Sequence, residues 1–162
     1  MSHTVSPEDP LARLRTLGLL PRPPYAFPAL PIPWRIVVVS SPPSAGYADF
    51  AAVLDGVAGI TLRLIPTALH DPLAVSHAIA AAGHDTGATA LAVVRGGGDG
   101  LDVFNAWPVL YALADAPHFT VLGVGHASDT VLAGQAVDHE AITPTAAAAF
   151  LAAQRRDCPV RP

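Results

Sequence analysis

Three segments of this sequence combine small residues with side chains that can hold an anion or move a proton. They are residues 40–46 (SSPPSAG), Arg95 with the glycines that follow it, and a stretch that holds His126 and Asp129. Glycines let backbone amides approach an anion closely, and an arginine can grip a phosphate with two hydrogen bonds. A histidine near a carboxylate can act as an acid or base near neutral pH. These residue types indicate chemistry on a phosphate or another anion.

Each segment also has a purely structural interpretation. The glycine run can be an exposed turn, and no lysine follows it as the phosphate loop of nucleotide triphosphatases requires. Residues 123–128 (GVGHAS) resemble the dinucleotide-binding pattern but end in serine instead of glycine. Asp129 can cap a helix, and Asp49 can be a solvated helix residue. From spacing alone, both interpretations stay open.

The elements that would position these segments alternate regularly. Short apolar runs predict strands at 35–40, 60–65, 89–94 and 119–124. Apolar residues at helical spacing predict helices over 45–57, 72–82, part of 102–114 and 129–135. A last helix begins after Thr143. The alternation predicts an α/β fold: a doubly wound, mostly parallel sheet of four to five strands with helices on both faces, Rossmann-like. Ligands bind at the carboxyl ends of such strands, so the three segments should converge on one edge.

The predicted organisation has three parts. Residues 1–34 form a short helix and a proline-rich strap, because ten of the seventeen prolines fall before residue 44. Residues 35–155 form the α/β domain, and 156–162 form a tail.

Composition excludes several classes of protein. With 162 residues, 51% hydrophobic and 14% charged, the chain has enough apolar residues for one packed domain. No apolar run is long enough to span a membrane, and no secretory signal is present, so we expect a cytoplasmic protein.

Cys158 is the single cysteine, which excludes an intramolecular disulfide. The net charge of −4 predicts no general attraction to nucleic acid. The histidines show no metal-ligand spacing, so no metal is expected.

Four ordered blocks resemble the catalytic domain of the exodeoxyribonuclease VII large subunit, and the resemblance spans nearly the whole chain. That family reads T-S-P-T-G-A-A-x-x-D, then G-R-G-G-G-S-x-E-D-L-x-x-F-N, A-V-G-H-E-x-D and A-D-x-R-A-x-T-P-x-A-A-A. The matching blocks here are 39–49 (VSSPPSAGYAD), 95–105 (RGGGDGLDVFN), 123–129 (GVGHASD) and 137–148 (VDHEAITPTAAA).

The resemblance implies metal-independent hydrolysis of single-stranded DNA to oligonucleotides, with no cofactor. It implies four catalytic residues, which are Asp49, Arg95, His126 and Asp129. It also suggests residues that contact phosphate or DNA: Ser41, Gly96, Gly97, Gly98, Asn105, Gly125 and Thr143.

The sequence also departs from the family pattern. Ala127 stands in place of a glutamate, Asp99 in place of a serine and Glu140 in place of an arginine, and two residues are missing between Gly98 and Phe104. These changes favour an alternative: a non-catalytic remnant that binds a protein partner or a phosphate-containing ligand through the glycine loop.

We expect neither the family's strand-binding OB-fold nor its helical arm in this chain. We therefore expect weak activity alone and no binding of the small subunit, with single-stranded DNA as the partner. Whether the chain forms homo-oligomers stays open.

Overall fold

A computed structural model describes residues 9–24, 33–42, 44–98, 100–125 and 131–158. In chain order the elements are α1 (Pro10–Thr16), β1 (Trp34–Ser40), α2 (Ala45–Leu54), β2 (Ile60–Pro66), α3 (Pro72–Gly83), β3 (Ala90–Arg95), the 3₁₀ helix η2 (Leu101–Asn105), α4 (Trp107–Asp115), β4 (Phe119–Val124), the 3₁₀ helix η3 (Leu132–Ala136), β5 (His139–Ala141) and α5 (Pro144–Asp157). No helix among the described residues is long and apolar enough to cross a membrane.

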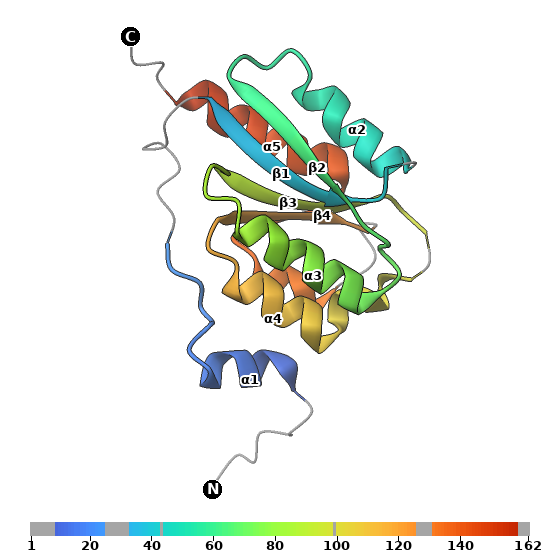
Figure 1. Ribbon diagram of the computed structural model, residues 1–162, viewed down its shortest axis with the longest axis vertical. Helices are drawn as coiled ribbons and strands as arrows, with labels where there is room; N and C mark the ends of the chain where they lie inside the picture. Colours follow the sequence, from blue (N-terminus) through green and yellow to red (C-terminus); the bar gives the residue numbers. More distant parts are fainter. Residues whose placement is uncertain (1–8, 25–32, 43, 99, 126–130, 159–162) are drawn as a thin grey trace, which may run out of the picture.

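The strands form one sheet in the order β2-β1-β3-β4-β5, and every neighbouring pair is parallel. From β1 the chain moves outward to β2, then crosses back to β3 and continues in the other direction. The reversal lies between β1 and β3, which is where open parallel sheets of this kind bind their ligands. All strands end at the edge from which α2 begins, on the right in Figure 1.

Helices cover both faces of the sheet, as Figure 1 shows. On one face α3 packs beside α4, and on the other α2 packs beside α5. Side chains of β1 alternate between the two cores: Val37 and Val39 face α3 and α4, whereas Ile36 and Val38 face α2 and α5. The central strands are buried on both sides, which explains why they appear in the sequence as continuous apolar runs.

Helix starts are well marked in the sequence. Four helices begin with a capping residue whose side-chain oxygen accepts a hydrogen bond from a backbone amide of the first turn. The caps are Asp9 for α1, Ser44 for α2, Asp71 for α3 and Thr143 for α5. Proline occupies the first turn of α1, α3, α4 and α5, where its missing N–H is not needed.

The predicted fold class is confirmed, with five strands and helices on both faces. Two details of the prediction were wrong. The first helix of the α/β unit ends at Leu54, before Val57, because the backbone of Asp55 is extended and Gly56 then adopts a positive φ of 79°. The expected helix over 129–135 is, in its described part, the short 3₁₀ helix η3. Residues 126–130 lie outside the described residues.

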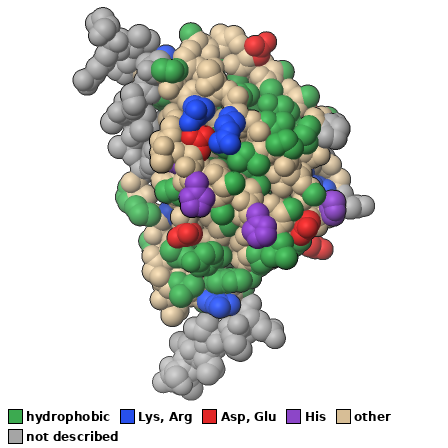
Figure 2. Space-filling view, in the orientation of Figure 1, with side chains coloured by type: hydrophobic (Ala, Val, Ile, Leu, Met, Phe, Trp, Pro, Cys, Tyr) green, Lys and Arg blue, Asp and Glu red, His purple; other side chains and the backbone are tan. Residues whose placement is uncertain are grey.

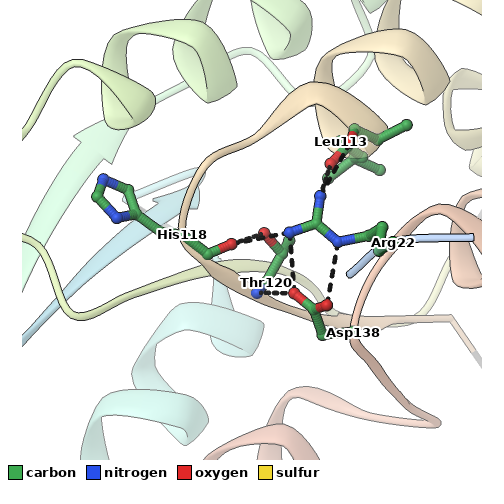
Figure 3. Close-up of polar contacts among 6 residues, drawn as sticks. Arg22, Leu113, His118, Thr120 and Asp138 are labelled. Atoms are coloured by element: carbon green, nitrogen blue, oxygen red, sulfur yellow. Dashed lines mark hydrogen bonds and ion pairs between the residues drawn. The ribbon is translucent and has the colours of Figure 1, made fainter. Parts of the chain in front are cut away.

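A buried arginine joins the segment after α1 to the sheet. Arg22 makes two hydrogen bonds to the Asp138 carboxylate, at 3.1 and 2.9 Å (Figure 3). Its other donors reach the carbonyls of Leu113, Ala114 and His118 at 2.7–3.1 Å. Both side chains of the pair are at most 10% exposed. The pair is therefore a fixed structural anchor, well shielded from water.

A close backbone approach joins α2 to the end of β3. A Cβ at Gly46 would lie 2.4 Å from the Gly96 nitrogen, closer than real Cβ atoms come to other atoms. Only glycine lets the first turn of α2 lie against the loop that follows Arg95. This contact sets the distance between two of the three segments singled out in the sequence.

Replacing Arg22 by alanine should destabilise the fold by about 3 kcal/mol, because it leaves the buried Asp138 carboxylate without its cation. Urea unfolding of R22A measures this loss. The exposed Arg15 on α1 is the matched control, and R15A should change stability by less than about 0.5 kcal/mol. Equal, small effects of both variants would show that the Arg22 contacts are not a stabilising anchor.

Replacing Gly46 by alanine should destabilise the fold by about 1–3 kcal/mol, because two backbone segments must move apart. Gly96 is the control on the other side of the contact. A Cβ there would meet its nearest neighbour at 3.5 Å, and its φ is not positive. Thermal unfolding should therefore show G96A as neutral or slightly stabilised. A stable G46A protein would contradict the close approach.

Candidate functional site

A hollow of about 610 Å³ lies at the carboxyl ends of β1, β2 and β3. Three connections line it: the β1–α2 turn with Ser41 and Ser44, the β2–α3 segment with His70, and the start of the glycine loop after β3. Its remaining lining residues are Ala45, Gly46, Ala68, Leu69, Arg95, Gly96 and Gly97. The hollow thus lies at the reversal of strand order, between β1 and β3.

The β1–α2 turn is held in a fixed form. The Ser44 amide donates to the Ser41 carbonyl at 3.1 Å, and the Ser44 hydroxyl accepts from the Tyr47 amide at 3.2 Å. Ser40 is fully buried, and its hydroxyl donates to the Val94 carbonyl at 2.8 Å. These bonds tie the end of β1 to β3 and aim the N-terminus of α2 at the hollow.

Arg95 is the last residue of β3, and its side chain turns back over its own loop. The guanidinium Nη1 donates to the carbonyls of Gly96 and Gly98, each at 3.5 Å. These are long hydrogen bonds, which hold the group over the loop weakly. Among the described residues that line the hollow, Arg95 is the one arginine and none is acidic.

The other predicted site residues lie around this edge with different roles in the fold. Asp49 is exposed on α2, one turn beyond Gly46. Gly98 and Gly125 have positive φ angles of 124° and 86°. The Asn105 side-chain oxygen accepts from the Leu132 amide at 2.7 Å, which joins η2 to η3. The Thr143 hydroxyl caps α5 by accepting from Ala146 at 3.0 Å.

The structure therefore brings Ser41, Arg95, Gly96 and Gly97 together around one hollow. The residues that line this hollow do not include the other described site candidates, which are Asp49, Gly98, Asn105, Gly125 and Thr143. His126 and Asp129 lie outside the described residues. Val124 is the register partner of Arg95, so Gly125 leaves the sheet beside the end of β3.

Sequence reasoning missed His70. The histidines show no metal-ligand spacing, and His70 was not among the predicted site residues, but the structure places it in the lining of the hollow. A usable signal existed: His70 lies in the loop that follows the predicted strand 60–65, and β2 ends at the same edge as β1 and β3.

The ion pairs between described residues lie at the opposite edge of the sheet. Asp85 precedes β3 and bonds Arg35 of β1 and Arg63 of β2. Burial alone would raise the pKa of Asp85, but the hydrogen bonds from Arg63 and Arg35 outweigh it and hold the pKa below its usual value. Arg22 and Asp138 also lie near the starts of strands, beside Thr120 and His139. No cluster of three or more potential metal-ligating side chains occurs among the described residues.

Comparison with known proteins gives a consistent family. The model of the family described as "Exonuclease VII, large subunit" matches residues 25–161. The chain is 40% identical over 127 residues to the exodeoxyribonuclease 7 large subunit of Thiobacillus denitrificans, covering 74% of this chain and 28% of that protein. It is 34% identical over 142 residues to that of Cyanothece, covering 84% of this chain and 33% of that protein.

A shorter match, of 60 residues, is 50% identical to the protein of the same name from Erythrobacter litoralis, covering 36% of this chain and 13% of that protein. The chain spans about a third of the length of the curated relatives that it matches over most of its own length. With a family model that covers most of the chain and relatives of this similarity, the chain belongs to the exonuclease VII large subunit family.

Proposed function

We propose that this chain hydrolyses phosphodiester bonds of single-stranded DNA, with the phosphate seated in the hollow at the ends of β1 and β3. Its relatives are named as exodeoxyribonucleases, which supports a nuclease. The observation that carries the proposal is the composition of the hollow: its described lining contains an arginine, glycine backbone and two serines, and none of these described residues is acidic.

Electrostatics favour an anion at this place. The first turns of α2 and α3 contain no acidic side chain, and α3 is capped by the carboxylate of Asp71. The positive end of α2 therefore favours an anion at the hollow. Arg95 adds a full positive charge. In contrast, the face in Figure 2 carries few charged side chains, scattered singly or in small groups. This face therefore offers a polyanion little attraction.

The reaction has a simple chemical form. The oxygen of a water molecule forms a bond to phosphorus while the bond from phosphorus to the leaving oxygen breaks, and a proton passes from the water to the leaving oxygen. Arg95 and the backbone amides of the glycine loop neutralise the charge that builds on the phosphate oxygens. We assign the proton transfer to His126, with Asp49 and Asp129 orienting the imidazole or the water. No step requires a metal ion.

The isolated chain should act weakly. Its net charge of −4 gives no general attraction for a polyanion, and the hollow offers only a few contacts to one strand. Strand binding by a dedicated surface with aromatic side chains adds about 1–3 kcal/mol per stacked base, and the hollow does not supply such stacking among its described lining residues.

The test is cleavage of a labelled single-stranded oligonucleotide at low salt, in EDTA and separately in Mg²⁺. Wild-type protein should give short products in both. Replacing Arg95 by methionine should reduce the rate about a hundredfold or more, as loss of one group that stabilises transition-state charge does. H126A and D129A should lose most activity. H77A is the matched control, because His77 is exposed on α3 and does not line the hollow, and it should cleave like wild type.

Two outcomes would contradict this proposal. If H126A and D129A both cleave at the wild-type rate, the assignment of proton transfer is wrong. If folded wild-type protein binds the strand through the glycine loop but yields no products at high concentration, the chain is a non-catalytic binding remnant.

A further inference from the structure

The β2–α3 segment contributes an imidazole to the hollow. His70 is exposed and lines the hollow together with Arg95 and Gly96. Its side chain makes no hydrogen bond with any residue that the structure describes. An exposed histidine without a role would not need an anchored backbone. The anchoring of the residues around His70 therefore distinguishes a ligand-binding residue from an ordinary surface residue.

The backbone on both sides of His70 is anchored. The Thr67 amide donates to the Ser40 carbonyl at 2.9 Å, which fixes the segment to the end of β1. Leu69 is 7% exposed and packs into the core beneath α3. Asp71 caps α3, and its own amide donates to the Ala68 carbonyl at 3.1 Å. His70 is therefore held between a buried residue and a helix cap.

The Asp71 carboxylate bonds the backbone of α3 and not the neighbouring His70. One of its oxygens accepts from the Leu73 amide at 3.0 Å, as the cap of α3 requires. The cap keeps this carboxylate at the start of α3, so the imidazole N–H beside it remains available to another acceptor.

The sheet order places His70 and Arg95 on two sides of one point. β2 and β3 are the two neighbours of β1, and strands lie about 4.8 Å apart, so β2 and β3 run about 10 Å from each other. Arg95 ends β3, and His70 lies in the segment that follows β2, and both line the hollow. A phosphate over the end of β1 would therefore have Arg95 on its β3 side and the β2–α3 segment on its β2 side. That point is also faced by the N-terminus of α2.

We propose that His70 is a further substrate-contacting residue: its imidazole donates a hydrogen bond to a phosphate oxygen of the bound strand, from the β2 side of the hollow, while Arg95 binds from the β3 side. This inference rests on the proposed function, because the strand is the substrate assigned there. His70 holds the phosphate in place and does not carry the reacting proton.

The experiment combines kinetics with a direct signal from the imidazole. H70A should raise KM for the single strand about tenfold, as loss of one hydrogen bond to a charged group does, and should leave kcat nearly unchanged. H77A, on the same helix that His70 precedes, should change neither constant. Thermal unfolding should be the same for both variants and the wild type, since His70 is exposed and makes no hydrogen bond with a described residue.

The second readout does not depend on cleavage. The NMR signal of the His70 ring, assigned by its absence in H70A, should shift when a single strand with phosphorothioate linkages is added. The His77 signal should stay in place. An unshifted His70 signal together with an unchanged KM in H70A would overturn the inference.

The two proposals fail in different ways. Wild-type cleavage with wild-type KM in H70A would retain the nuclease and overturn the role of His70. A strand-dependent shift of the His70 signal in a protein that never cleaves would retain the contact and overturn the nuclease.

Discussion

The backbone contact between Gly46 and Gly96 is the constraint on which the site depends. It brings the start of α2 against the loop after β3, at the point where the strand order reverses. A side chain at Gly46 would push the start of α2 away from the loop after β3, which would change the shape of the hollow between β1 and β3. Both glycines belong to segments that the sequence marks as unusual, but only the fold explains why Gly46 lacks a side chain while Gly96 could accommodate one.

The two edges of the sheet serve different purposes. At the amino-terminal edge, Arg22 and Asp138 satisfy each other in a buried network, and Asp85 bonds two further arginines. Charges there hold distant segments of the chain together. At the carboxyl-terminal edge, Arg95 makes long bonds to its own loop, and no acidic side chain occurs among the described residues that line the hollow. The ion pairs between described residues thus stabilise the fold at one edge, and an arginine lines the hollow at the other.

Strong local patterns made much of the fold predictable. The continuous apolar runs of β1, β3 and β4 and the start of the last helix after Thr143 were predicted, because burial on both faces and capping leave clear sequence signatures. Weak patterns were not recognised. β5 has three residues, and η3 is held by the Asn105 amide through a contact across 27 residues of sequence. Neither element is marked by a repeating pattern of apolar residues in the sequence. His70 was missed because its significance comes from strand order, which a single sequence does not specify.

The central claim is that the hollow at the ends of β1 and β3 seats a phosphate group of a single strand. A crystal structure of this chain with a bound phosphorothioate oligonucleotide tests it most directly. The account predicts a linkage with an oxygen about 3 Å from a backbone nitrogen of Gly96 or Gly97, and within reach of the Arg95 guanidinium. A strand bound elsewhere, with the hollow free of phosphate, would contradict it.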